Sequence, residues 1–224
     1  MVQDRISGID HHFDNPDLLN EALTHRSVGR SNNERLEFLG DSVLNVVVSE
    51  RLFELRPEAS EGDLSRMRAR IVRGETLSRI ASAIKLGDHL NLGEGELKSG
   101  GFRRPSILAD SLEAIFGAIY LDAGFDKCRT VILQLTDKMI SDLPDAEDLK
   151  DPKTRLQEWA QARGNPLPNY ELIGEEGADH QKQFFIRCVL EADGISVDGS
   201  GSSRRKAQQA AARQALTEIS QRQS

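Results

Sequence analysis

The spacing of the hydrophobic residues changes once along this chain of 224 residues, and this change limits the possible folds most. Through residues 16–143 the apolar side chains recur every three or four positions, which indicates helices. After residue 168 short runs alternate instead, and Phe184, Ile186, Cys188 and Leu190 fall on one face of the most regular run. This alternation is typical of a strand with one face on a core. We therefore predict an all-α part followed by a small α+β part.

The elements follow from the same spacing and from the Gly, Pro and Asn residues between the apolar runs. In the first part we expect helices at Pro16–His25, Glu34–Leu55, Ser60–Leu86, Ser106–Asp122 and Asp126–Leu143. In the second part we expect the order α-β-β-β-α, with a helix at Lys153–Arg163, strands at Asn169–Glu175, Gln183–Glu191 and Ile195–Asp198, and a helix at Arg204–Ile219.

An acidic, proline-containing stretch, Asp142–Pro152, separates the two parts and has the composition of a solvated linker. The predicted domains are residues 1–145 and 153–221, joined by a linker at 146–152. The net charge also differs between the two parts. Residues 1–148 carry 26 acidic and 18 basic side chains, a net charge of −8, whereas residues 149–224 carry 10 and 11, a net charge of +1.

Composition excludes several classes of protein. Cys128 and Cys188 lie 60 positions apart, so they form neither a zinc motif nor a disulfide framework, which suits a reducing compartment. No apolar run approaches the roughly 20 residues that span a bilayer, so we expect a cytoplasmic protein without a membrane partner. The net charge of −7 on its own argues against a polyanionic partner, but its uneven distribution leaves that question open.

The predicted helix that begins at Glu34 carries carboxylates where a solvated face is not expected. Its core side is predicted to hold Leu36, Leu39, Val43, Val46 and Val47. The other side combines acidic and large apolar groups, namely Glu34, Glu37 and Asp41 with Phe38, Leu44 and Val48. A helix of this composition has little ordinary solvated surface beyond its first turns.

The predicted helix at Ser106–Leu121 is more apolar still, because its only charged residues are Asp110 and Glu113. Any one such carboxylate is usually solvated or paired with arginine, but no basic residue lies in this stretch, and burial without a cation is costly. Oxygen ligands from two helices suit Mg²⁺ or Mn²⁺, and phosphodiester hydrolysis is a chemistry that often needs them. A di-iron bundle is the alternative, but neither helix has its Glu-x-x-His pair.

Other charged residues admit two interpretations each. Glu61 follows Ser60, a predicted N-cap with Asp63 three residues on, so Glu61 is interpreted as structural. The arginines of 66–73, and Arg103 and Arg104 after the Gly-rich loop Gly93–Gly101, either form solvated faces or contact a phosphate backbone. The last helix begins with Arg204, Arg205 and Lys206, where the helix dipole disfavours cations, which indicates an anion there.

Four ordered segments resemble the ribonuclease III family: ALTHRS at 22–27, NERLEFLGDSVL at 33–44, EGDLSRMR at 61–68 and ILADSLEAIFGA at 107–118. Residues 151–220 resemble a double-stranded RNA-binding domain, including GSGSSRRKA at 199–207. The resemblance covers essentially the whole chain. It implies a homodimer that cuts double-stranded RNA with Mg²⁺, leaves 5′-phosphates and short 3′ overhangs, and acts on ribosomal RNA precursors and other structured transcripts.

The resemblance also implies roles for individual residues. The metal ligands would be Glu37, Asp41, Asp110 and Glu113, with Asp41 and Glu113 essential for catalysis and the metal ion activating a water. Glu34 and Glu61 would be supporting acidic residues, which reverses the structural interpretation of Glu61. Phe38 would insert into the partner subunit.

In the second part the resemblance implies minor-groove contacts from Gln157, Glu158 and His180. Phosphate contacts would come from Arg204, Arg205 and Lys206. Gln208 departs from the pattern, since many such domains have a lysine there, so RNA affinity is expected to be weaker or more salt-sensitive. The alternative function is a double-stranded RNA-binding protein that has lost its chemistry, and the loss of a core carboxylate would indicate it. None of the four is missing.

Overall fold

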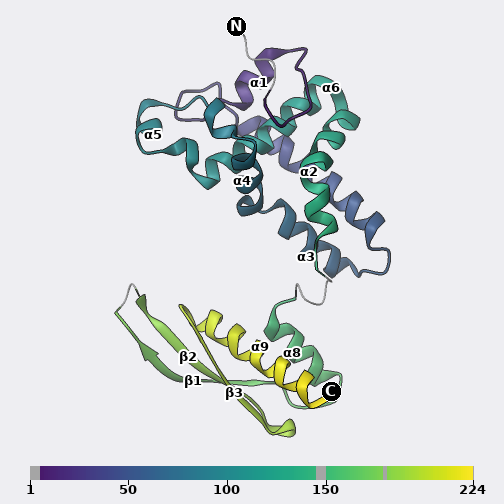
Figure 1. The fold of residues 1–224 in the computed structure, drawn as a ribbon, viewed down its shortest axis with the longest axis vertical. Helices are drawn as coiled ribbons and strands as arrows, with labels where there is room; N and C mark the ends of the chain where they lie inside the picture. The colour runs from purple at the N-terminus through teal and green to yellow at the C-terminus, as the bar shows by residue number, and fades with distance from the viewer. Residues whose placement is uncertain (1–5, 145–149, 179–180, 224) are drawn as a thin grey trace. The chain divides into compact units, whose positions relative to one another are not determined.

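The computed structural model describes residues 6–144, 150–178 and 181–223. The chain divides into two compact units, Met1–Ala146 and Glu147–Ser224, each with its own core. Figure 1 shows the first unit built of helices and the second built of helices on a sheet. The predicted fold class is confirmed. The predicted linker at 146–152 falls largely on 145–149, which lie outside the described residues.

The first unit contains only helical elements within its described range. They are α1 (Pro16–Ala22), α2 (Glu34–Leu55), α3 (Glu61–Val72), α4 (Gly74–Ala83), η1 (Leu86–His89), α5 (Glu94–Lys98), η2 (Gly101–Arg103) and α6 (Pro105–Ser141). The predicted bounds of α2 are confirmed. The short elements α5 and η2 occupy the stretch that was predicted to be a Gly-rich loop.

The core of this unit forms where α6 packs along α2, with α1 and α4 packed on α6. Leu44, Val47 and Val48 of α2 are fully buried, whereas Val46 is 55% exposed. The predicted core side of this helix was therefore wrong for Val46, and the prediction that Leu44 and Val48 share the acidic face was also wrong. The physical reason is that α1, α3 and α6 all contact α2, so its buried arc is wide and rotated relative to the predicted stripe.

The predicted helices differ from the structure at three places. The helix expected at Ser60–Leu86 is two helices, because Arg73 is extended at ψ 145° and the Thr76 hydroxyl donates to the Arg70 carbonyl at the break. The two helices expected at 106–143 run together as α6, which is interrupted at Gly124, where φ is +80°. The first helix ends at Ala22 rather than His25, because Thr24 pairs with Asn91 in an isolated bridge.

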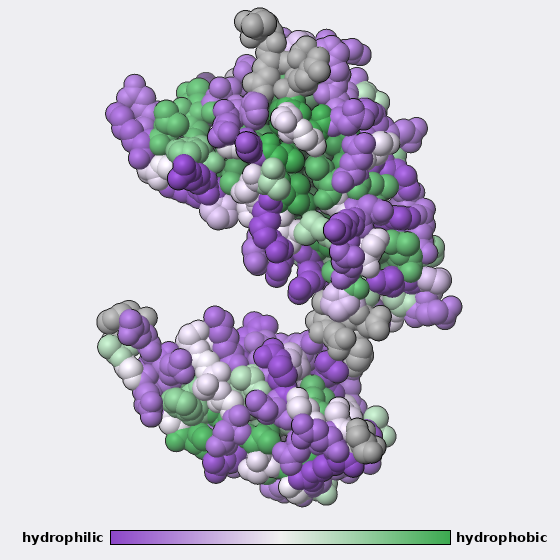
Figure 2. All heavy atoms as spheres, in the orientation of Figure 1, coloured by the Kyte–Doolittle hydropathy of each residue, from purple (hydrophilic) through white to green (hydrophobic). Residues whose placement is uncertain are grey.

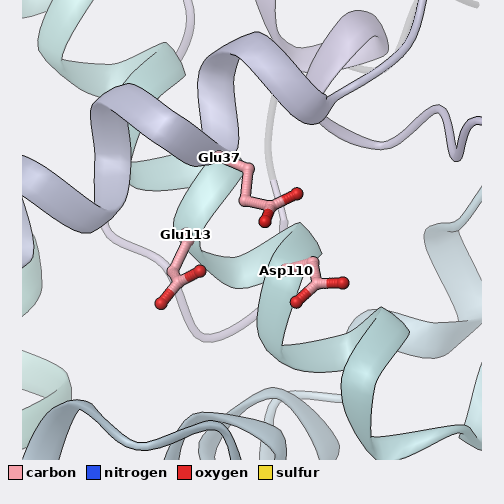
Figure 3. A group of neighbouring side chains, drawn as sticks. All are labelled: Glu37, Asp110 and Glu113. Carbon is pink, nitrogen blue, oxygen red and sulfur yellow. The ribbon is translucent and has the colours of Figure 1, made fainter.

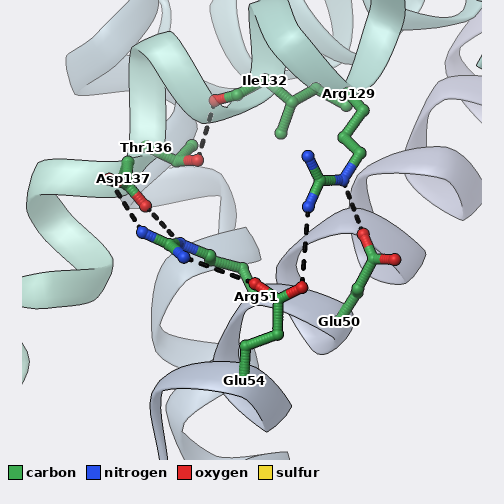
Figure 4. A network of polar contacts seen from close by, with 7 residues as sticks. All are labelled: Glu50, Arg51, Glu54, Arg129, Ile132, Thr136 and Asp137. Carbon is green, nitrogen blue, oxygen red and sulfur yellow. Dashed lines mark hydrogen bonds and ion pairs between the residues drawn. The ribbon is translucent and has the colours of Figure 1, made fainter. Parts of the chain in front are cut away.

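An ion-pair network fastens the C-terminal half of α2 to the later part of α6 (Figure 4). The Arg51 guanidinium donates to Asp137 at 2.6 Å and to Glu54 at 3.3 Å. From the other side, Arg129 donates to Glu50 at 2.6 Å and lies 3.8 Å from Glu54. Each carboxylate of this network thus has an arginine partner, and these side chains are partly exposed.

The second unit is a three-stranded antiparallel sheet with two helices. It consists of α8 (Pro152–Gln161), β1 (Asn169–Glu176), β2 (Gln183–Leu190), η4 (Glu191–Asp193), β3 (Ile195–Gly201) and α9 (Arg204–Gln223), with strand order β1-β2-β3. The predicted alternation of β2 is confirmed, because Ile186, Cys188 and Leu190 are buried. They pack against small residues of α9 such as Ala211 and Ala215, which allow the helix to approach the sheet closely.

Hydrophilic residues cover much of the visible face of each unit, with hydrophobic residues gathered in patches between them (Figure 2). Within residues 6–144, 150–178 and 181–223, no helix combines the length and the apolar composition needed to cross a membrane.

Candidate active site

Three carboxylates from two helices meet at one place in the first unit. Glu37 comes from the first turn of α2, and Asp110 and Glu113 lie one turn apart on α6. One oxygen from each lies within 4.8 Å of the others, and Figure 3 shows the three side chains neighbouring one another across the two helices. The three are half-buried. We call this group the carboxylate triad.

The triad is an electrostatically unfavourable arrangement by itself. Burial raises the pKa of Glu113 to about 8, and the charges of Asp41, Glu37 and Asp110 add to this effect. Burial likewise raises the pKa of Glu37 and of Asp110 above their usual ranges. Among the described residues, no hydrogen-bond donor or cation is paired directly with any of the three carboxylates. A bound divalent cation would relieve both the burial and the repulsion.

Contact between helix backbones sets the spacing of the triad. A Cβ atom added to Gly40 would lie 1.8 Å from the Glu113 carbonyl oxygen, and one added to Gly117 would lie 2.2 Å from the Leu36 carbonyl oxygen. Only glycine fits at these two positions without moving a helix. The start of α2 is held to α6 as well, because the buried Asn33 amide donates to the Ser111 hydroxyl at 3.4 Å.

Two other acidic residues of α2 flank the triad. Asp41 lies outside the group of three, is exposed, and accepts a hydrogen bond from the Asn45 amide at 2.8 Å. Its charge nevertheless contributes to the raised pKa of Glu113. Glu34 is exposed and lies 3.6 Å from the Arg26 guanidinium. Of the four predicted ligands, the structure therefore brings three within a common coordination distance and places the fourth beside them.

Glu61 is the first residue of α3, a different helix from the two that carry the triad, and it is not one of the three clustered carboxylates. The predicted capping box is present, since the Ser60 hydroxyl accepts from the Asp63 amide and the Asp63 carboxylate accepts in return. Glu61 accepts from the Ser65 hydroxyl at 2.8 Å and is exposed. It lines a cavity of about 640 Å³ together with Leu52, Phe53 and Leu64.

The second unit presents cations at the start of α9, but they are not equivalent. Arg204 is paired with Glu175 of β1 at 2.8 Å, and Lys182 pairs with the same carboxylate at 2.6 Å. Together these cations lower the pKa of Glu175. Lys206 donates to the Ser202 hydroxyl at 3.2 Å. Arg205 is exposed, and no residue in the described ranges pairs with it.

The predicted minor-groove residues lie on α8 and in the β1–β2 connection. Gln157 and Glu158 are exposed, and Glu158 accepts from the Lys150 ammonium at 2.8 Å. His180 lies outside the described residues.

Comparison with known proteins assigns both units. Residues 15–139 match the model of the Ribonuclease-III-like family, and residues 152–219 match the double-stranded RNA binding motif. The chain is 56% identical over 207 residues to Ribonuclease 3 of Thiobacillus denitrificans, covering 92% of each chain. The chain belongs to the ribonuclease III family. It is also 52% identical to Ribonuclease 3 of Xanthomonas oryzae pv. oryzae, covering 96% of this chain and 95% of that one.

Solved structures of the family support the assignment of the first unit. The nuclease domain of ribonuclease III from Campylobacter jejuni is 45% identical with a TM-score of 0.58, and the match covers 61% of this chain and 94% of that one. A second structure of that domain, at 48% identity and a TM-score of 0.56, covers 57% and 90% and is described for flexibility in a region involved in dimer formation. The expected membership of the ribonuclease III family is thus confirmed.

Beside the triad the ribonuclease III unit places two residues that sequence reasoning did not select, His25 and Arg26, together with Arg104, one of the arginines considered above for phosphate contact. A cavity of about 440 Å³ adjoins the triad and is lined by Glu37 and Asp110 together with His25, Arg26 and Arg104. Arg104 is held there by Glu96 at 2.6 Å. His25 and Arg26 belong to the ALTHRS segment, which contributes to the resemblance but from which no residue role was predicted. Their long-range placement depends on the Thr24–Asn91 bridge, which no local pattern indicates.

Proposed function

We propose that this chain is a metal-dependent endoribonuclease that hydrolyses phosphodiester bonds in double-stranded RNA. One observation carries the proposal. A triad of half-buried carboxylates, which forms no ion pair with a cation of the described residues, occurs in the same chain as a double-stranded RNA-binding motif with cations at the start of its last helix. The alternative, a non-catalytic RNA-binding protein, is not favoured, because all four core carboxylates are present.

The donor set fits a hard divalent cation. Glu37, Asp110 and Glu113 offer three oxygens within 4.8 Å of one another, with Asp41 beside them, and Mg²⁺ takes a few carboxylates together with water and phosphate oxygens. We propose Mg²⁺ as the cofactor, with Mn²⁺ able to substitute. When bound, the ion supplies the Lewis acidity that activates a water and offsets charge on the scissile phosphate.

The roles of the protein groups follow from their surroundings. Glu113 is the most buried of the three and its pKa is raised to about 8, so its carboxyl group would have to release a proton to hold a metal ion. Asp41, fixed by Asn45, contributes negative charge at the solvent side of the triad. In this proposal Asp41 and Glu113 are catalytic, Glu34 and Glu61 support the acidic surface, and the products carry 5′-phosphates and short 3′ overhangs.

We propose that the enzyme is a homodimer with two such sites. Phe38 adjoins Glu37 on α2 and is 78% exposed, which is unusual for a phenylalanine without a partner. The cavity lined by Leu52, Phe53 and Leu64 is the matching apolar recess, so a self-complementary pairing would place Phe38 in the recess of the other subunit. Glu61 of the partner subunit would then lie near the triad, which explains how a residue far from it supports the site.

The second unit would recognise the shape of A-form RNA. In this proposal Gln157, Glu158 and His180 contact the minor groove, while Arg204, Arg205 and Lys206 contact phosphates across the major groove. Arg205 is exposed and uncompensated within the described ranges, which suits phosphate contact, and Arg204 exchanges Glu175 for phosphate on binding. The expected substrates are ribosomal RNA precursors and other structured transcripts in the cytoplasm.

The decisive experiment is incubation of the full-length protein with a long RNA duplex, with Mg²⁺ and with a chelator. We expect discrete short duplex products only with Mg²⁺, bearing 5′-phosphates when their ends are mapped. A duplex that stays intact with Mg²⁺, or that is cut equally well with the chelator, would refute the metal-nuclease proposal. A Phe38→Ala variant measured by sedimentation tests the dimer separately, and we expect it to shift toward the monomer.

A second experiment tests the RNA-binding unit. Removal of residues 151–224 deletes the proposed phosphate contacts, so duplex binding should weaken, most strongly at high salt. An unchanged salt dependence would contradict the role given to Arg204, Arg205 and Lys206.

A further inference from the structure

The amino group of Lys153, the second residue of α8, contacts two other elements of the second unit, and the residue is half-buried. Its Nζ atom donates to the Gln208 side-chain oxygen of α9 at 2.6 Å and lies 4.8 Å from the centre of the Tyr170 ring of β1. Both contacts keep the ammonium at a defined place, and both partners are uncharged. No carboxylate within the described ranges pairs with this ammonium.

The carboxylate nearest in sequence is engaged elsewhere. Asp151 is the N-cap of α8, accepts from the Lys153 backbone amide at 2.9 Å and accepts from the Gln209 side-chain amide at 2.5 Å. Gln208 therefore accepts from the lysine, while Gln209 donates to the aspartate. Each of the two charges thus has a neutral glutamine of α9 as its side-chain hydrogen-bond partner, and within the described ranges Asp151 and Lys153 form no ion pair with each other.

The contact with Gln208 brings the Lys153 ammonium to α9, the helix that begins with the cations of the second unit. Gln208 lies one turn after Arg204 on the same face of α9, since residues four apart are neighbours on a helix. Gln208 thus holds the Lys153 ammonium beside the face that carries Arg204, whose own charge is partly offset by Glu175. An ammonium has three donors, and Gln208 uses one, so donors are left for an anion.

We propose that Lys153 is a further phosphate contact of the RNA-binding surface and that Gln208 positions it. The pair delivers positive charge at the second turn of α9, where the residue of α9 itself is a neutral amide. The inference rests on the proposed binding of double-stranded RNA by this unit. Because α9 and β1 already restrain the side chain, little rotamer freedom is lost when phosphate binds.

The test is binding of the full-length protein to a labelled RNA duplex, without divalent cation so that no cleavage occurs, over a series of KCl concentrations. Lys153→Gln should weaken binding several-fold and reduce the slope of log affinity against log salt by about one. Lys153→Arg keeps the charge and should retain the slope. The double variant Lys153→Gln with Gln208→Lys exchanges the two groups across the same contact and should recover both affinity and slope.

The controls separate this inference from the proposed function. Arg205→Gln tests the RNA-binding surface itself. If Arg205→Gln alters the slope and Lys153→Gln does not, the inference is wrong and the proposed function stands, whereas failure of the wild type to bind duplex RNA overturns both. Thermal unfolding of each variant detects a structural role. A lower melting temperature with an unchanged salt slope would assign Lys153 to packing alone, and failure of the exchanged variant to recover the slope would also overturn the inference.

Discussion

The two ends of the α2–α6 pair carry carboxylates in opposite circumstances. At the C-terminal end of α2, the acidic side chains of Figure 4 are joined to Arg51 and Arg129, with the closest contacts at 2.6 Å. Toward the other end, the triad of Figure 3 has no cation paired with it in the described part of the chain. The same two helices therefore neutralise one acidic group with arginine and leave the other without a partner.

This difference is the one expected if the paired charges belong to the fold and the triad, as proposed, serves a ligand. The ion pairs at the C-terminal end of α2 are partly exposed, and such pairs stabilise a protein only slightly. The triad is more buried and repulsive, so in the absence of metal it works against folding. A destabilising group of carboxylates is typical of a site where ligand binding requires it. This is the physical argument for proposing the chemistry at the triad.

The largest expected effect comes from the triad. Glu113→Gln preserves size but removes the charge, so cleavage of an RNA duplex in Mg²⁺ should fall by at least about a thousandfold, while duplex binding without metal stays near that of the wild type. Gel-based cleavage rates and binding isotherms measure the two effects. Asp137→Asn at the ion-paired end is the matched control and should cleave normally. Equal losses of cleavage in both variants would show that the carboxylates at the two ends do not differ in function.

The next largest effect tests the contact that brings the helices together. Gly40→Ala places a Cβ atom against the Glu113 carbonyl oxygen, so the helices must separate, and the free energy of unfolding should fall by about 3 kcal/mol. Denaturant unfolding measures this loss. Gly95→Ala is the control, because a Cβ atom there meets nothing within 4 Å. Similar stability of the two variants would show that the helix crossing tolerates a side chain.

A smaller effect concerns pH. Folding raises the pKa of Glu113 from 4.5 to about 8, so the folded protein keeps a proton that the unfolded chain releases between these values. Without metal, the free energy of unfolding should therefore fall as pH rises from 4.5 to about 8 and change little from this source above that. Allowing for solvent screening, the fall should be on the order of 1 kcal/mol.

Denaturant unfolding in a chelator, repeated across this pH range, measures that slope. Glu113→Gln should remove most of it, and added Mg²⁺ should raise stability more at high pH than at low pH. A slope that is the same in the wild type and in the variant would place the responsible group elsewhere.

The smallest effect is expected at the ion-paired end. Arg51→Met removes the contacts to Asp137 and Glu54 but keeps much of the aliphatic stem, so the free energy of unfolding should fall only slightly and by less at high salt. Cleavage should be unaffected. A loss of several kcal/mol would mean that this network stabilises the α2–α6 pair as strongly as its apolar core.

Local patterns predicted the parts of the fold that depend on neighbouring residues. The bounds of α2, the capping box of Ser60 and Asp63, and the alternation of β2 all follow from side chains a few positions apart. The break at Arg73 was missed, because α4 turns there to pack on α6, and that packing is not a local property.

For the candidate site, too, local patterns predicted some features and missed those that depend on distant residues. The sequence identified the unusual carboxylates of two apolar helices and predicted that they share a divalent-cation site, and the resemblance then assigned a role to each of them. The contact of Gly40 and Gly117 with the opposite helix was missed, because it joins segments more than 70 residues apart. The structure shows that the three carboxylates of the triad lie together, but their roles, those of Asp41, Glu34 and Glu61, and those of the residues proposed to contact RNA stay predictions.

The backbone contact at Gly40 and Gly117 has a consequence for the choice of metal ion. Because the two helices already touch, the gap between Glu37 and the α6 carboxylates cannot narrow, and any larger residue at either glycine widens it. Mg²⁺ binds oxygen at about 2.0–2.1 Å and Ca²⁺ at about 2.3–2.6 Å, so a wider gap shifts preference toward the larger ion. If the triad binds metal as proposed, the separation of the two helix axes would act as a size filter, and two residues that bind no metal themselves would influence which ion the carboxylates accept.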